Sequence, residues 1–169
     1  MAIKKEETAK RKPTRLQGYD FSQNGAYFVT VCTHHRTQML SHIVGQGLAP
    51  AQIRLTTYGK IVERQLLDIE KRYETVKIDK YVIMPNHIHV IFIIENAKAG
   101  ASPCPTLSDV MCSFKSVATR LCKQAHHIEK VFQNSFYDHI IRNENDYLEI
   151  WRYIDDNPAK WQEDRFYIP

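Results

Sequence analysis

The chain is 169 residues long, a length that fits one compact domain with a hydrophobic core of ordinary size. Its hydrophobic content of 43% and charged content of 25% are average for a globular protein. No apolar run reaches the roughly 18 residues that a membrane-spanning helix requires, so no membrane span is expected. A net charge of +4 permits a polyanionic partner without identifying one. The first residues lack the apolar core of a secretory signal, so we expect a cytoplasmic location.

Residues 1–17 carry six basic side chains against two acidic ones. Such a segment buries too little apolar surface to order itself, and it is predicted to be a flexible basic arm. A merely solubilising tail is an equal alternative. Residues 18–161 are predicted to form a single domain, because neither an internal repeat nor a second core pattern interrupts them, and residues 162–169 are predicted to be a tail.

A first strand is predicted at residues 27–33, where β-branched and aromatic residues follow the turn signal Asn24-Gly25. The stretch 42–56 contains glycine and proline, which favours a loop or a short hairpin. Apolar residues then recur at helical spacing through residues 58–73, and this period predicts a first helix.

Two further strands are predicted at residues 76–84 and 87–94. The tight corner at Pro85-Asn86 between them indicates a hairpin, because asparagine tolerates unusual backbone conformations. The composition of residues 96–105 is typical of a flexible linker.

An unbroken apolar stripe predicts a second helix at residues 107–125, and a short strand is expected within 131–141. A final helix is predicted to begin after Asn143, a good N-cap, and to end near Asn157-Pro158 because proline cannot continue it. The order β-α-β-β-α-β is that of the ferredoxin-like plan. We therefore predict an α+β fold with an antiparallel sheet, two helices on one face and an additional C-terminal helix.

His87 and His89 open an almost wholly apolar run, which favours a central strand buried on both faces. Side chains alternate across a strand, so the two histidines share one side and Ile88 faces the other. Two imidazoles at this spacing can converge on one cation. The alternative is a pair of histidines hydrogen-bonded at the sheet edge, and a metal or phosphate site would also need a third ligand and a nucleophile.

The final helix offers both missing groups. Tyr153 lies about 110° from the centre of the apolar stripe, at its boundary, and Asn157 lies on the same side one turn later. The pair presents a hydroxyl nucleophile and an amide oxygen, a hard ligand suited to magnesium or manganese. Tyr147, inside the stripe, and Tyr137, without a comparable partner, are rival nucleophiles. The alternative for Tyr153 is a boundary tyrosine with a solvated hydroxyl.

Residues 81–90 (Tyr-Val-Ile-Met-Pro-Asn-His-Ile-His-Val) resemble the histidine-hydrophobic-histidine (HUH) segment of the single-tyrosine transposases. Residues 136–142 and 152–158 are similar to the REP-associated branch of that group, and residues 25–30 fit its opening strand. The likeness covers about residues 15–161. Each motif is modest, but the set is specific in this order and spacing.

The resemblance implies a ferredoxin-like fold in which Tyr153 is the catalytic nucleophile and His87, His89 and Asn157 hold Mg²⁺ or Mn²⁺. Insertion-sequence relatives often carry glutamine where this chain has Asn157. The implied activity is a single-stranded DNA transposase and endonuclease, acting in DNA transposition and recombination. It would cleave and rejoin hairpin-bearing DNA through a covalent 5′-phosphotyrosine. The tyrosine hydroxyl needs activation, and the sequence reveals no base for it.

DNA phosphates would be contacted by Lys115, Arg120 and Lys123 on the polar side of the second helix, and by Arg142 together with the basic arm. The alternative for each of these residues is a solvated surface charge, which is the commoner role for any single one. The REP-associated branch recognises short palindromic hairpins, whereas the insertion-sequence branch works as a dimer with its tyrosine helix serving the partner's histidines, so a homodimer stays open. Two other functions also stay open: a catalytically inactive hairpin-binding protein and a metal-dependent phosphodiesterase with a water nucleophile.

Overall fold

The computed structural model describes residues 20–21, 23–45, 51–95, 105–126 and 128–169. The predicted basic arm and residues 96–104 of the predicted linker lie outside the described residues. Among the described residues, every helix is too short or too polar to cross a membrane.

A four-stranded antiparallel sheet forms the centre of the fold, with strand order β4-β5-β1-β6. Its strands are β1 (Gly25–Cys32), β4 (Val76–Ile83), β5 (His87–Ile94) and β6 (Tyr137–Ile141). Helices precede β4 and β6 in the chain, so the connectivity and the strand order are those of the predicted ferredoxin-like plan. β5, with the two histidines at its start, is an internal strand as expected from its apolar sequence.

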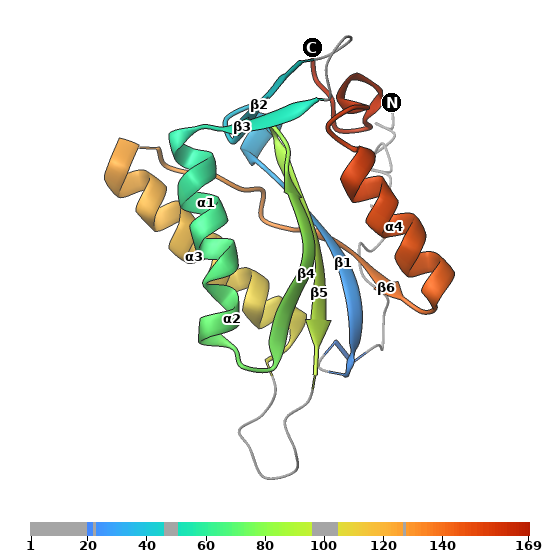
Figure 1. Cartoon of the computed structure of the whole chain (residues 1–169). Helices are drawn as coiled ribbons and strands as arrows, with labels where there is room; N and C mark the ends of the chain where they lie inside the picture. The colour runs from blue at the N-terminus through green and yellow to red at the C-terminus, as the bar shows by residue number, and fades with distance from the viewer. Residues whose placement is uncertain (1–19, 22, 46–50, 96–104, 127) are drawn as a thin grey trace, which may run out of the picture.

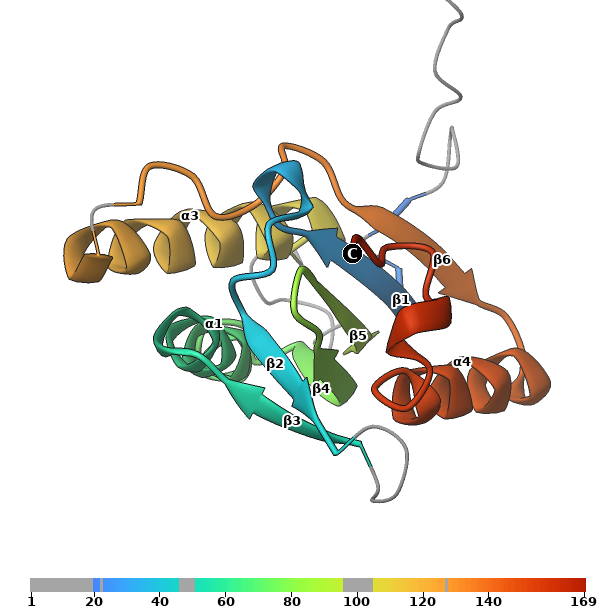
Figure 2. The same cartoon turned by 90° about the horizontal axis from the view of Figure 1, so that it is seen from above.

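Helices cover both faces of this sheet. α1 (Thr57–Leu67) and α3 (Leu107–His126) lie side by side on one face, and α4 (Glu144–Asp156) crosses the other (Figure 1 and Figure 2). The predicted helix over residues 58–73 is divided at Asp68 into α1 and a short α2 (Ile69–Arg72).

A hairpin of β2 (Ser41–Val44) and β3 (Gln52–Leu55) occupies the stretch predicted as a loop or short hairpin. Two short turns remain: η1 (His34–Arg36), in which His35 is not helical (φ 53°, ψ 19°), follows β1, and a single 3-10 turn, η2 (Trp161–Glu163), follows α4. α4 begins as predicted, because the Asn143 side chain accepts a hydrogen bond from the Asp146 amide at 3.0 Å.

The sheet separates two apolar cores, and β5 contributes to both. Ile88, Val90 and Phe92 belong to the larger core, which includes residues of α1 and α3. Ile91, on the other face, packs with Ile154 of α4. Since side chains alternate along a strand, His87 and His89 share the face of Ile91. The histidine pair therefore lies between the sheet and α4.

Candidate active site

The hydrogen-bond partner of His87 defines which ring nitrogen carries the proton. Its Nδ1 lies 2.9 Å from Asn86 Oδ1, while Asn86 Nδ2 donates to the Phe166 carbonyl at 2.8 Å. That second bond turns the amide oxygen of Asn86 towards the ring, so His87 Nδ1 must be the donor. The Nε2 atom of His87 is then left with a free lone pair, which is the state that a metal ligand requires.

His89 is oriented in a similar way by the strand beside it. Thr30 of β1 pairs with His89 in the sheet, and its Oγ1 lies 2.8 Å from His89 Nδ1. The Nε2 atoms of the two fully buried histidines lie 3.0 Å apart. Two imidazoles bound at right angles to one cation, each at about 2.1 Å, would show a nitrogen separation of about 3.0 Å. The spacing fits a shared metal ion.

Burial keeps both rings uncharged near neutral pH. Loss of solvent contact lowers the pKa of His87 to about 4, although the nearby Asp164 carboxylate raises it. Burial also lowers the pKa of His89 well below its ordinary value, and the neighbouring His87 adds to this effect. Neutral imidazoles are the form that binds metal ions.

α4 places Tyr153 directly over the histidine pair. Its hydroxyl oxygen lies 3.2 Å from His89 Nε2 and 3.3 Å from Asp164 Oδ2, and 39% of the residue is exposed. The ring packs edge-on against Phe28 of β1. Burial of the hydroxyl and the charge of Asp164 raise the pKa of Tyr153 to about 12. Ionisation of this hydroxyl therefore needs positive charge nearby.

The two rival tyrosines lie elsewhere. The Tyr147 hydroxyl donates to Asp79 Oδ2 at 2.7 Å, and this hydrogen bond raises the pKa of Tyr147 to about 12. The exposed Tyr137 ring lies against Phe166 and the Arg165 guanidinium. Only Tyr153, among the three, lies within hydrogen-bond distance of a histidine of the pair in the described structure.

Asn157 and Asp164 complete the group of polar side chains around the histidine pair and Tyr153. Asn157 Nδ2 donates to Asp164 Oδ2 at 2.6 Å, and this carboxylate oxygen lies 4.0 Å from His87 Nε2. A carboxylate only accepts, so the bond fixes the orientation of the Asn157 amide. Asn157 Oδ1 is the buried side-chain atom that lacks a hydrogen-bond partner among the described residues. A metal ion would satisfy this oxygen, which would otherwise carry a desolvation penalty.

Asp164 is the residue that sequence reasoning missed, since it lies in the stretch 162–169 predicted as a tail. The turn of η2 returns the chain towards the sheet, and Asp164 Oδ1 accepts the Phe166 amide at 2.6 Å. Together with His87 and His89 it forms a group whose ligand atoms lie within 4.8 Å of one another. Beside Tyr153 a cavity of about 240 Å³ is lined by Tyr153, Asp156, Asn157, Lys160, Glu163, Asp164 and Arg165.

The basic residues predicted to contact DNA lie away from the histidines. Lys115, Arg120 and Lys123 line a groove along α3, on the sheet face opposite α4. The Lys115 ammonium is half-buried and donates to the Asn134 carbonyl at 2.8 Å. Arg142 is exposed immediately after β6. The structure thus gathers three of these residues into one groove but does not bring them to Tyr153.

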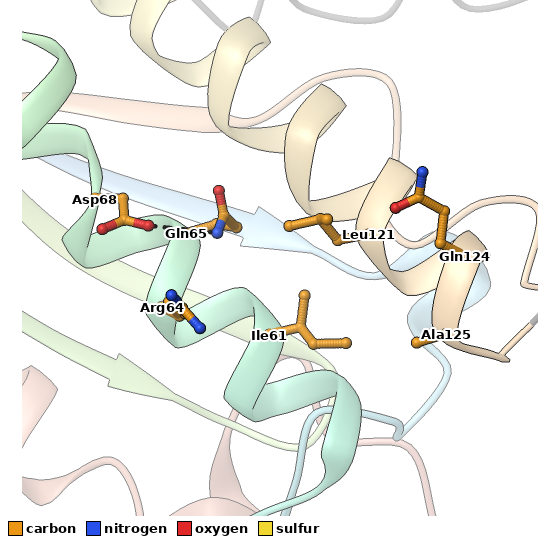
Figure 3. A pocket seen from close by; sticks show the side chains of 7 residues that line it. All are labelled: Ile61, Arg64, Gln65, Asp68, Leu121, Gln124 and Ala125. Carbon is orange, nitrogen blue, oxygen red and sulfur yellow. Dashed lines mark hydrogen bonds between the residues drawn. The ribbon is translucent and has the colours of Figure 1, made fainter.

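A second groove lies between α1 and α3, also on the face opposite α4 (Figure 3). Its floor is apolar, with Ile61 and Leu121 facing each other across the two helices, and Arg64 and Asp68 lie along its α1 side. Histidine, cysteine and tyrosine are absent from its lining, which gives it no counterpart of the chemistry around Tyr153.

Comparisons with known proteins identify relatives of this chain in sequence and in fold. No family model matches the chain. An uncharacterized protein of Haemophilus influenzae is 33% identical, with 94% of this chain and 93% of that protein aligned. The REP-associated tyrosine transposase of Escherichia coli K12 is 26% identical over 83% of this chain and 70% of its own length.

The solved structure of a REP-associated tyrosine transposase bound to a REP hairpin has the same fold, with a TM-score of 0.63 and 23% identity. The match covers 87% of this chain and 73% of that one. The chain belongs to the same family as the Haemophilus influenzae protein and resembles the REP-associated tyrosine transposases in sequence and fold.

Proposed function

We propose that this protein cleaves and rejoins single-stranded DNA through a covalent bond between Tyr153 and a 5′-phosphate. One observation carries the proposal: the Tyr153 hydroxyl lies 3.2 Å from His89 Nε2, which is itself 3.0 Å from His87 Nε2. A nucleophile and two metal-binding nitrogens thus meet at one point, in a partly open site. The arrangement fits phosphoryl transfer, which depends mainly on positioning and on charge stabilisation.

The residues present fit a divalent cation. His87 and His89 would bind it through Nε2, and Asn157 through the unpartnered Oδ1, with Asp164 beside them. Two nitrogens joined by amide and carboxylate oxygens suit Mn²⁺ or Mg²⁺. When bound, the cation supplies Lewis-acid polarisation of the scissile phosphate and positive charge beside the tyrosine hydroxyl.

The chain itself supplies the nucleophile and a route for its proton. Tyr153 Oη attacks phosphorus, the P–O3′ bond breaks, and the leaving 3′ oxygen takes up a proton to become a hydroxyl. Asp164 Oδ2, 3.3 Å from the tyrosine hydroxyl, is placed to accept the tyrosine proton. Attack by a 3′-hydroxyl on the phosphotyrosine reverses the step and rejoins the strands without ATP.

The substrate we propose is hairpin-bearing single-stranded DNA, as the solved complex of a REP-associated tyrosine transposase with a REP hairpin suggests. The basic groove on α3, with Lys115, Arg120 and Lys123, and the exposed Arg142 would contact phosphates away from the cut. Tyr153 contacts His89 of its own chain, which supports catalysis within one subunit rather than between two.

The test is a denaturing protein gel after incubation with labelled hairpin DNA and Mn²⁺. Label is expected to stay with the wild-type protein and with Tyr147→Phe, and to be lost from Tyr153→Phe. Tyr147→Phe is a matched control because it removes a hydroxyl from the same helix outside the site. Cleavage without adduct in Tyr153→Phe would indicate a water nucleophile, and binding without cleavage in the wild type would indicate an inactive binding protein.

A further inference from the structure

Two guanidinium groups flank the histidine pair. The central guanidinium carbons of Arg36 and Arg165 lie 5.3 Å and 4.6 Å from the centre of the Phe166 ring. The buried Phe166 ring in turn lies 4.7 Å from the His87 ring. Cation–π contacts of this kind hold the plane of a guanidinium while leaving its N–H edge available. The two positive charges are therefore fixed beside the proposed catalytic site.

The backbone that carries Arg36 is strained. His35 and Arg36 have φ values of 53° and 55°, in the left-handed region that few non-glycine residues adopt. The turn follows directly from β1 and is closed by the Arg36 amide donating to the Thr33 carbonyl at 3.1 Å. Strain of this kind persists where surrounding structure enforces it and is concentrated at functional sites. Here it holds the base of the Arg36 side chain at the end of the strand that faces His87.

Both guanidiniums lack a carboxylate partner within ion-pair distance in the part of the chain that the structure describes. Of the three acidic residues that line the cavity beside Tyr153, Asp156 pairs with Lys160 and Asp164 accepts from Asn157, while Glu163 is exposed to solvent. Arg165 itself lines that cavity. Arg36 lies outside this lining, and its Nη1 donates to the Arg165 carbonyl at 3.5 Å, which ties the two arginines together. Guanidiniums without a carboxylate partner are suited to a phosphate, which accepts two parallel N–H bonds from one guanidinium.

We propose that Arg36 and Arg165 form a phosphate clamp, which binds the phosphodiester next to the scissile one and aligns the strand with Tyr153. This inference rests on the proposed function of the site. The clamp is a binding and positioning element, and it takes the backbone of single-stranded DNA irrespective of the base. Phosphate binding gives these two arginines a role other than pairing with the Asp164 carboxylate of the site.

The clamp is tested by replacing single phosphates with uncharged methylphosphonates at successive positions on either side of the cut. In the wild type, one neutral position is expected to lower kcat/KM for adduct formation by about tenfold or more, mainly through KM. In Arg36→Gln and Arg165→Gln, kcat/KM for the fully charged DNA is expected to fall by a similar factor. In these variants, the methylphosphonate at that position should lower kcat/KM by less than about twofold more, because the arginine–phosphate contact is already absent.

Arg64→Gln is the matched control, because Arg64 is an exposed arginine on α1, on the opposite face of the sheet (Figure 3). It should retain the wild-type response to every methylphosphonate. Thermal melting of each variant checks the fold, and Arg165→Lys, which keeps the charge without the bidentate fork, should recover only part of the loss.

The same methylphosphonate series is measured by fluorescence anisotropy without metal, so that binding is followed whether or not the protein cuts. The clamp would be overturned if, at every phosphate, the loss of affinity in an arginine variant and the loss caused by the methylphosphonate were independent and simply multiplied. Absence of any adduct in the wild type, together with coupled losses in anisotropy, would instead refute the proposed nuclease and leave the clamp standing.

Discussion

Asn157 Nδ2 donates to Asp164 Oδ2 at 2.6 Å, and this hydrogen bond determines what the Asn157 amide offers to the site. The amide nitrogen is committed to the carboxylate, and the amide oxygen remains a buried acceptor without a partner among the described residues. Asp164 thus orients a proposed metal ligand that lies seven positions earlier in the chain.

Asp164→Asn is predicted to weaken Mn²⁺ binding by about 10- to 100-fold, the range seen when groups that orient metal ligands are replaced. The substituted amide can present either an acceptor or a donor, so the Asn157 orientation is no longer enforced. Isothermal titration with Mn²⁺ measures the effect. Asp156→Asn is the control, since Asp156 lines the same cavity but pairs with Lys160 on the surface. Equal affinities in the two variants would contradict the role of Asp164.

Asn157→Ala is predicted to lower adduct formation more than Asn157→Gln does. Alanine removes the ligand oxygen, whereas glutamine keeps an amide oxygen on a side chain one methylene longer. The comparison is made in initial rates of adduct formation over a range of Mn²⁺ concentrations, where excess metal should rescue the glutamine variant first. A glutamine variant as inactive as the alanine variant, with no rescue by excess Mn²⁺, would contradict the role of Asn157 Oδ1 as a metal ligand and indicate that Asn157 is needed for packing.

Local patterns in the sequence predict much of this site, because the relevant periodicities are local. The alternation of β5 places His87 and His89 on one face, and the apolar stripe of α4 leaves Tyr153 at its boundary. Asp164 and Arg36 carry no such signal. Asp164 reaches the site only because the chain turns back after α4, and the left-handed conformation of Arg36 follows from neither its own residue type nor that of His35.

The break between α1 and α2 was also beyond the sequence pattern, since apolar residues keep helical spacing across it. Asp68 retains φ −70° but has ψ −7°, and its amide contacts the carbonyls of Arg64 and Leu66. A shift of this size in one backbone angle leaves the order of apolar side chains unchanged, so periodicity predicts a single helix over residues 58–73.

Thr30→Val is predicted to reduce Mn²⁺ affinity by about tenfold with little change in the fold. Valine has nearly the shape of threonine and suits a strand, but it removes the oxygen that lies 2.8 Å from His89 Nδ1. The His89 ring would then lack the hydrogen-bond partner that fixes its orientation. Metal titration gives the affinity, and thermal melting verifies the fold. Thr30→Ser, which keeps the hydroxyl, should behave like the wild type.

Catalysis within one chain is predicted from the 3.2 Å separation of Tyr153 Oη and His89 Nε2. A mixture of Tyr153→Phe with a His87→Ala/His89→Ala double variant should form no adduct, because neither subunit holds a complete site. Since removal of two buried histidines can perturb the fold, the double variant is first checked by circular dichroism and by DNA binding. The wild type gives an independent measurement: its adduct yield per protein molecule should stay constant through a wide dilution series. A yield that falls on dilution, or activity restored by mixing, would place the tyrosine helix of one subunit over the histidines of another.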